Sequence, residues 1–169
     1  LLILECTRGS SPRDPEYTRR SEAEKLGQSI EQCLENDGSV MIPLFAMGKT
    51  QETITMLYDL QKAKKLRRLS FLIGGLSIKM TKIYDRFSNS VRRNHLGMKL
   101  MREKGLLSTP NSRGEIPQIS KGNVYTLSSG MMTEKTLSNR LARHFVTNPR
   151  NLIASVGYAD PESPLARVL

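Results

Sequence analysis

The sequence predicts an α/β fold built on a doubly wound, mostly parallel sheet of about five strands flanked by helices. Short apolar runs rich in β-forming residues alternate with longer segments whose apolar residues recur at helical spacing. Turn residues such as glycine, asparagine and proline separate many of these segments. Strands that alternate with amphipathic helices are typical of βαβ units, in which neighbouring strands run parallel.

Five apolar runs are predicted as strands. Residues 40–45 (VMIPLF) follow the turn residues 36–38, and Pro43 is a weakness in this assignment because proline donates no ladder hydrogen bond and fits best near a strand end. The predicted strands are residues 1–4, 40–45, 69–73, 123–127 and 151–156.

Four segments are predicted as helices. The first begins at a capping box formed by Ser21 and Glu24 and ends at the turn 36–38, with Cys33 on its apolar face. The second starts after Gly48 and continues to about residue 66. The third covers residues 78–87 and the fourth about 134–145. Candidate core positions of the third helix are Ile78, Met80, Ile83, Tyr84 and Phe87.

Residues 88–122 show no clear periodicity. They are predicted as one or two helices followed by a long basic loop, and loops of that length are commonly functional. This segment is the candidate for a flap that faces nucleic acid.

The charge balance favours a polyanionic partner. The 169 residues contain 26 Lys and Arg against 16 Asp and Glu, which gives a net charge of +10. Such an excess suits nucleic acid or an acidic membrane surface, although many basic proteins bind neither. Only 5% of the residues are aromatic and none is Trp, so contact with the phosphate backbone is favoured over base stacking.

Cysteine and histidine usage limits the chemistry. Cys6 and Cys33 show no C-x-x-C spacing, which fits a reducing cytoplasm, the expected location. The two histidines, His95 and His144, belong to no cluster with carboxylates at ligand spacing. A self-contained zinc site needs about three or four ligands, so none is expected in this chain. No apolar run has membrane-spanning length, and no signal peptide or membrane partner is indicated.

The polar segments converge on one edge of the predicted sheet. In doubly wound sheets, ligands bind outside the carboxyl ends of the strands. The segments that follow the predicted strands are residues 5–11, 48–51, 74–75, 128–130 and 157–163. They predict a single polar, basic rim, which is the candidate binding site.

The turn at Gly48, Lys49 and Thr50 allows two interpretations from chemistry alone. A nucleotide-binding P-loop needs a glycine five places before Gly48, where this chain has Pro43, and a strand that ends in Asp to hold magnesium, which is not found. The other interpretation is an ordinary strand-to-helix turn without a ligand. The unpaired N–H groups expected at the start of such a helix, with its positive dipole end, would suit a phosphate.

Three motifs resemble a known family. Residues 43–52 (PLFAMGKTQE) resemble the Pro-x-Phe-Ala-x-Gly-Arg-x-Gln-Glu motif of the β-CASP region in metallo-β-lactamase-type nucleases, with Lys49 in place of Arg. Residues 5–9 (ECTRG) match the acid, the threonine and the glycine of the family's motif A. Residues 128–132 (SSGMM) match its Ser-Ser-Gly-Met loop. Ser163 and Pro164 stand where the family usually has Gly-Thr.

The family includes the endonuclease subunit of the polyadenylation machinery and ribonuclease J. The resemblance covers nearly all of the chain and implies that residues 1–169 are the cap domain of a zinc-dependent ribonuclease-like hydrolase in RNA processing. Because residues 1–4 lack a starting methionine, the chain is expected to be a fragment. Residues 1–9 and 157–169 would be junctions with a missing metallo-β-lactamase domain, which would carry the metal ligands.

The resemblance also implies roles for particular residues. Glu5 would support the metal site by orienting a histidine. The substrate phosphate would be bound by Thr7, Arg8, Gly48, Lys49, Thr50, Ser128, Ser129, Gly130 and Ser163. Expected partners are RNA or another single-stranded nucleic acid and the missing domain, and a homodimer of the parent is allowed. The alternatives are a non-catalytic nucleic-acid-binding or scaffold module and, with less support, an NTP-binding domain.

Overall fold

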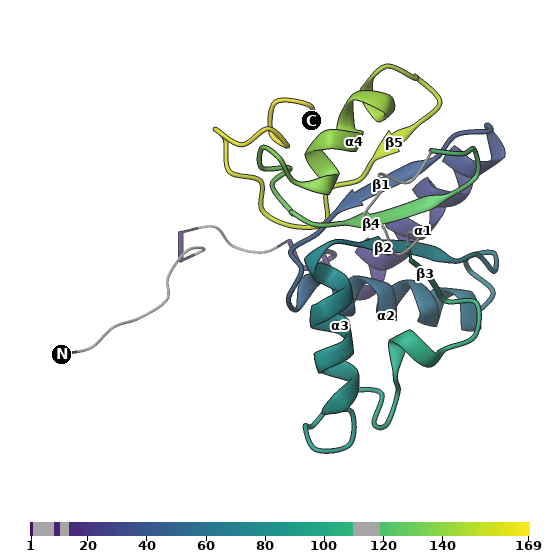
Figure 1. The fold of residues 1–169 in the computed structure, drawn as a ribbon, viewed down its shortest axis with the longest axis vertical. Coiled ribbons are helices and arrows are strands. Elements are labelled where there is room, and N and C mark those ends of the chain that lie inside the picture. Colours follow the sequence, from purple (N-terminus) through teal and green to yellow (C-terminus); the bar gives the residue numbers. More distant parts are fainter. Residues whose placement is uncertain (2–8, 11–13, 110–118) are drawn as a thin grey trace.

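A computed structural model describes residues 1, 9–10, 14–109 and 119–169 of the chain. It confirms the α/β class. Five strands form one sheet in the order β3-β2-β4-β1-β5, and every neighbouring pair is parallel (Figure 1). The strands are β1 (Val40–Pro43), β2 (Phe71–Gly74), β3 (Leu107–Ser108), β4 (Val124–Leu127) and β5 (Leu152–Ile153).

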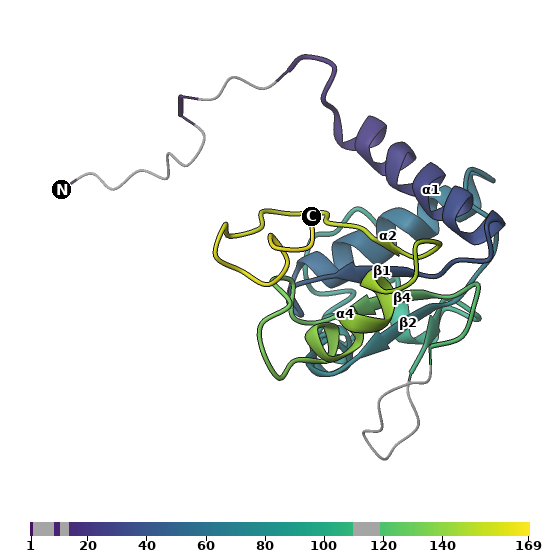
Figure 2. The same ribbon diagram turned by 90° about the horizontal axis from the view of Figure 1, so that it is seen from above.

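Four α-helices cover the two faces of this sheet. They are α1 (Arg19–Glu35), α2 (Lys49–Lys62), α3 (Leu76–Arg86) and α4 (Leu137–Val146), and a 3₁₀ helix, η1, spans Leu100–Arg102. Figure 2 shows α1 and α2 on one side of the sheet and α4 on the other. Both faces of the central strands are therefore covered, as a doubly wound sheet requires.

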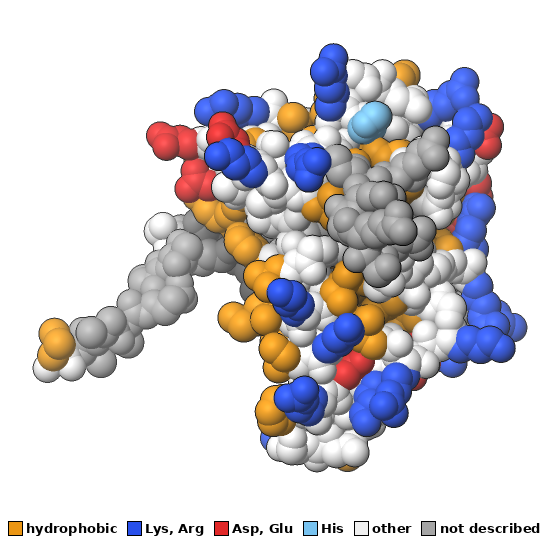
Figure 3. Space-filling model, viewed as in Figure 1, with side chains coloured by type: hydrophobic (Ala, Val, Ile, Leu, Met, Phe, Trp, Pro, Cys, Tyr) orange, Lys and Arg blue, Asp and Glu red, His pale blue; other side chains and the backbone are white. Residues whose placement is uncertain are grey.

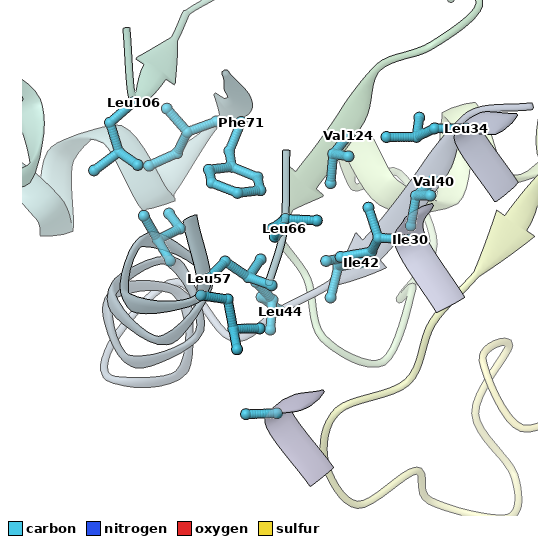
Figure 4. Close-up of a cluster of buried hydrophobic side chains, with 14 of the residues drawn as sticks. Ile30, Leu34, Val40, Ile42, Leu44, Leu57, Leu66, Phe71, Leu106 and Val124 are labelled. Atoms are coloured by element: carbon cyan, nitrogen blue, oxygen red, sulfur yellow. The ribbon is translucent and has the colours of Figure 1, made fainter. Parts of the chain in front are cut away.

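The strand alternation produces two cores. Val40 and Ile42 of β1 pack in the larger core under α1 and α2, whereas Met41 packs with Tyr125 and Phe145 on the α4 side. The rings of Tyr125 and Phe145 meet edge to face at 5.7 Å. Figure 4 shows how side chains from α1, α2 and the neighbouring strands meet in the larger core. Because both faces are buried, β1 and β4 have no exposed residue.

Four of the five predicted strands are found, although β1 and β5 are shorter than the predicted 40–45 and 151–156. Residues 1–4 lie mostly outside the described residues, so the strand predicted there stays a prediction. The fifth strand of the sheet is instead β3, within a segment predicted as helix and loop, where Leu107 pairs with Phe71. Pro43 is the last residue of β1, the place in a strand that tolerates proline. Residues 110–118, the centre of the predicted flap, are outside the described residues.

The first two helices differ from prediction at one end each. Helix α1 begins before Ser21: Thr18 is the N-cap, and its hydroxyl accepts a hydrogen bond from the Ser21 amide at 3.0 Å. The Thr18 amide in turn donates to the Ser21 hydroxyl at 3.0 Å, so Ser21 makes the reciprocal bond of the capping box that was expected of Glu24. Helix α2 ends at Lys62 and not near residue 66, because Lys64 adopts φ 58° and Leu66 turns back into the core.

The core positions predicted for α3 are partly wrong. Ile83 and Phe87 are exposed, while Ser77, Thr81 and Asp85 face the domain interior. The predicted residues of α4, Leu141 and Phe145, are buried as expected. Within the described residues, no helix is both long and apolar enough to cross a membrane.

Candidate functional site

Four of the five predicted segments lie together at the carboxyl edge of the sheet. Pro43, Gly74 and Leu127 end β1, β2 and β4, and they are aligned across the ladder. Beyond them, the Leu44 amide donates to the Leu127 carbonyl at 2.8 Å. A small hollow next to this point is lined by Phe45, Lys49, Gly130 and the chain from Ser155 to Tyr158. The fifth segment contains Glu5, Thr7 and Arg8, which lie outside the described residues.

The turn between β1 and α2 is built by the polar side chains of the predicted motif. Thr50 is fully buried and its hydroxyl donates to the Phe45 carbonyl at 2.8 Å. Gln51 is also buried; its side-chain oxygen accepts from the Gly48 amide at 2.8 Å, and its nitrogen donates to the Ala46 carbonyl at 3.1 Å. Gly48 has φ +80°, which glycine adopts without the strain a side chain would add. These two side chains therefore hold the turn in one conformation.

This construction changes what the turn offers to a ligand. The amides of Lys49 and Thr50 donate to the carbonyls of Met47 and Phe45 at 3.0 and 3.1 Å, and the Gly48 amide is taken by Gln51. The expectation of unpaired N–H groups at this helix start is therefore wrong for these three amides. With these three amides occupied, the exposed ammonium of Lys49 is the candidate side-chain group for a phosphate contact in this turn.

Lys49 is part of a small charged group. Its Nζ lies 3.0 Å from Glu52, and the other oxygen of Glu52 lies 2.8 Å from Arg19 of α1. All three side chains are substantially exposed, so each ion pair contributes little to stability. Two cations therefore share one carboxylate at the rim, which leaves a net positive charge beside the Gly48 turn.

The same polar side chains connect the turn to α3. Gln51 Nε2 donates to Thr81 Oγ1 at 2.9 Å, and the hydroxyls of Thr50 and Ser77 are 3.2 Å apart. Sequence reasoning missed this contact. Its signal was the pair Ser77 and Thr81, whose spacing of four residues places two hydroxyls on one face of the helix.

The loop after β4 is tightly packed against the end of β1. A Cβ on Gly130 would lie 2.8 Å from the Phe45 backbone nitrogen, so only glycine fits without a shift. Ser129 accepts from the Thr133 amide at 3.1 Å and donates to the Thr133 hydroxyl, so its own hydroxyl closes a turn. Ser128 is half-buried, and its Oγ lies 3.2 Å from the position of a Cβ on Gly75. The Ser128 carbonyl accepts from the Ser138 amide at 3.3 Å, whereas the Ser128 hydroxyl makes no hydrogen bond within the described residues.

Ser163 lies in a turn that packs below this loop. It is buried, and its hydroxyl accepts from the Ala166 amide at 3.2 Å. The nearby Leu165 amide donates to Met131, and Leu165 joins the core on the α4 side. The roles predicted for the rim residues stay predictions. Among the rim residues that the structure describes, only Lys49 and Ser128 present polar side-chain atoms that these internal bonds do not fully use.

The other titratable groups are structural in this geometry. Cys33 lies on the buried face of α1, where burial raises the pKa of its thiol, and it donates to the Arg150 carbonyl at 3.2 Å. Lys65 and Arg20 lower the pKa of Glu24 through hydrogen bonds to its carboxylate. His95 pairs with Asp59 alone at 3.0 Å. Across the parts of the chain that the structure describes, no three His, Cys, Asp or Glu side chains group closely enough to hold a metal ion.

Comparisons with known proteins agree with this geometry. The model of a family described as the Beta-Casp domain matches residues 50–168. The chain is 28% identical to an RNase J-like protein of Methanocaldococcus jannaschii, with 100% of this chain and 39% of that protein covered. It is 24% identical to cleavage and polyadenylation specificity factor subunit 3-II of Arabidopsis thaliana, with 94% and 25% covered. It is 26% identical to endoribonuclease YSH1 of Eremothecium gossypii, with 100% and 22% covered.

The chain thus spans at most about two-fifths of the length of these three relatives. The relatives are nucleases of the metallo-β-lactamase and β-CASP type. The family match covers α2 from Thr50 onward, the Ser128 loop and the segment that contains Ser163. This protein belongs to the β-CASP family.

Proposed function

We propose that this chain is the RNA-binding cap domain of a zinc-dependent ribonuclease-like phosphodiester hydrolase, whose metal site lies in another part of a longer polypeptide. The observation that carries the proposal is that the two family-like motifs that can be placed, after β1 and β4, lie at one edge of the sheet together with the segment that follows β5. Relatives that cover this chain include proteins named as ribonuclease-like and as an endoribonuclease.

The surface charge supports a polyanionic substrate. The net charge is +10, and Lys and Arg side chains outnumber acidic ones over the face seen in Figure 3. At the rim, Lys49 and Arg19 share Glu52, which leaves an exposed positive charge beside the turn. In the proposed function Lys49 contacts an RNA phosphate, and the Ser128 hydroxyl donates to a second oxygen of the same backbone.

The zinc that the family implies does not fit the residues described here. A zinc site needs about three protein ligands when catalytic and four when structural. The nearest approach among the described residues is the pair of His95 and Asp59, and no third donor joins them. We therefore derive no metal-dependent step from these residues. Their part in the proposed function is to hold and orient the RNA.

Of the alternatives, the NTP-binding domain is disfavoured by the geometry of the turn. A P-loop wraps a phosphate with free backbone amides and uses a Ser or Thr hydroxyl for magnesium. Here the amides of Gly48, Lys49 and Thr50 are used internally, and the Thr50 hydroxyl is buried against Phe45. A non-catalytic RNA-binding module stays open, and ribonuclease activity of the longer polypeptide separates it from the hydrolase.

The test is RNA binding by the rim. A single-stranded RNA oligonucleotide labelled with a fluorophore is titrated with the wild-type chain and with Lys49→Ala, and anisotropy gives the dissociation constant at several salt concentrations. Loss of one phosphate contact should weaken binding and lower the slope of log K against log salt by about 0.7. Lys104→Ala is the matched control, because Lys104 is exposed and precedes β3 at the opposite edge of the sheet.

If the slope of log K against log salt were equal for the wild-type chain and Lys49→Ala, Lys49 would not contact an RNA phosphate. Equal losses in Lys49→Ala and Lys104→Ala would show that binding follows net charge and not the rim. No RNA binding by the wild-type chain would reject the proposed function as a whole.

A further inference from the structure

Helix α3 has an inverted distribution of polar and apolar side chains. Ser77 and Thr81 are completely buried and Asp85 is 7% exposed, although these are polar residues. Leu76, Ile83 and Phe87 are 54%, 45% and 47% exposed. Soluble domains normally bury the apolar face of a helix, so this orientation needs a physical explanation.

The orientation is fixed by satisfied polar contacts on the inner face. Thr81 accepts from Gln51 at 2.9 Å and donates to the Ser77 carbonyl at 2.8 Å. The carboxylate of Asp85 accepts from the amides of Leu100 and Met101 at 2.9 and 2.8 Å. Rotating α3 to bury its apolar side would break all of these bonds and leave buried polar groups unpaired. The apolar side is therefore held outward.

The outward side forms a stripe of three exposed residues and the half-buried Met80, which we call the α3 stripe: Leu76, Met80, Ile83 and Phe87. The spacing of four, three and four residues places these side chains in one row along the helix. Figure 3 shows hydrophobic side chains in a row over the region of α3, with basic side chains beside them. Contiguous exposed apolar surface of this kind marks interaction sites in soluble proteins.

The charged side chains that α3 itself exposes beside the α3 stripe are all positive. Lys79, Lys82 and Arg86 recur every three or four residues along one edge, and each is exposed. None of them takes part in an ion pair within the described residues. On the other edge, Arg93 lies over the ring of Tyr84 at 5.7 Å. An occupant that covers the stripe would therefore meet cations on both edges.

We propose that the α3 stripe docks an acidic amphipathic helix of a partner protein. An apolar seam on the partner would cover Met80, Ile83 and Phe87, and Asp or Glu beside that seam would pair with Lys79, Lys82 and Arg86. Each free cation then gains a partner as the apolar area is buried. This assignment is independent of RNA binding at the rim.

Other occupants fit the surface less well. A second copy related by a two-fold axis would bring the same three cations of both chains to one interface, and like charges there repel. Nucleic acid would pair with the cations and leave the apolar row uncovered. An anionic membrane would accept both features, and it is distinguished by experiment.

The test uses two synthetic helical peptides with the same leucine seam, one flanked by glutamates and the other by lysines. Fluorescence anisotropy measures their binding to the wild-type chain. The glutamate peptide is expected to bind at least about tenfold more tightly, and salt is expected to weaken that binding. In the double variant Lys79→Glu/Lys82→Glu the preference should invert in favour of the lysine peptide.

Variants of the stripe test the apolar part. Ile83→Asp should abolish binding of the glutamate peptide, with unchanged helical circular dichroism as the check on folding. Val146→Asp is the matched control, because Val146 is a 53% exposed apolar residue at the end of α4. It should bind the peptide as the wild-type chain does. The inverted peptide preference of Lys79→Glu/Lys82→Glu tests the proposal even if Ile83→Asp does not fold.

Several results would overturn the proposal. If the wild-type chain and the Lys79→Glu/Lys82→Glu variant each bound the two peptides with equal affinity, the proposal of an acidic partner would be rejected. A dimer in sedimentation that Ile83→Asp dissociates would assign the stripe to a second copy. Binding to phosphatidylglycerol vesicles that Ile83→Asp abolishes, without peptide binding, would assign it to a membrane surface. Competition between RNA and the glutamate peptide that Lys49→Ala does not change would assign the edge cations to RNA.

Discussion

Gln51 is expected to be the single most important polar side chain of the rim. It is 5% exposed and makes three hydrogen bonds, with Gly48, Ala46 and Thr81. The Gln51→Leu substitution keeps a similar volume and removes all three. Each lost bond costs about 0.5–1.5 kcal/mol, so the free energy of unfolding should fall by about 2–4 kcal/mol.

The substitution also removes the constraint on the β1 turn. The Gly48 amide and the Thr81 hydroxyl would be left without these partners in a half-buried or buried position, and the turn would sample other conformations. RNA binding at the rim should weaken together with stability, because Lys49 follows Gly48 directly. A loss of this size lowers Tm by about 4–16 °C in a chain of this length.

Urea unfolding followed by circular dichroism measures the free energy, and Gln28→Leu is the matched control. Gln28 lies on the exposed face of α1 and is expected to change stability by less than about 0.5 kcal/mol. If Gln51→Leu lost less than about 1 kcal/mol, the three bonds would not hold the turn as described.

Three further changes probe other parts of the fold. Gly130→Ala should destabilise the protein by about 1–3 kcal/mol in urea unfolding, because the new Cβ meets the Phe45 backbone. Glu24 has a lowered pKa, so its stabilising effect is present at neutral pH and lost as the pH falls below about 4. Urea unfolding across this range should therefore show the wild-type chain and Glu24→Gln converging at acidic pH. The Cys33 thiol should react with Ellman's reagent only after denaturation, because it is buried and its pKa is raised.

Each of these predictions has a control. Gly157→Ala adds a Cβ with no atom within 4 Å, so it should stay within about 1 kcal/mol of the wild-type chain. If Gly130→Ala and Gly157→Ala lowered the free energy of unfolding equally, the close approach of Gly130 to the Phe45 backbone would not explain the loss. A stability difference between the wild-type chain and Glu24→Gln that persisted at acidic pH would show that the charged form of Glu24 is not the source of the stabilisation. The thiol measurement uses a Cys6→Ser background, and rapid labelling there would show that Cys33 is accessible.

Much of the fold follows from local patterns. The apolar runs around Ile42, Ile73 and Leu127 predicted three strands of the sheet, because a strand buried on both faces has little polar content. The helical repeat of Leu141 and Phe145 likewise predicted α4. These elements are fixed by hydrophobic burial, which periodicity records directly.

The core positions predicted for α3 were wrong where polar side chains form hydrogen bonds with residues distant in the sequence. Ile83 and Phe87 have the spacing of core residues, yet Thr81 and Asp85 face inward because Gln51, Leu100 and Met101 provide bonds there. Nothing within α3 itself indicates those partners. Tertiary contacts therefore overrode a local pattern, as they often do for helices.

For this protein, the alternation of strands and helices outside residues 88–122, the parallel sheet and the placing of the polar segments at its carboxyl edge followed from the sequence, because burial and alternation are local properties. The orientation of α3 and the occupied amides of the Gly48 turn were decided only in the folded chain. The orientation of α3 is set by hydrogen bonds to distant segments, as in the contact of Gln51 with Thr81. The amides of the Gly48 turn are occupied by partners close in sequence, which take these positions only when the turn is folded. A buried polar group must find its partner wherever the fold places one.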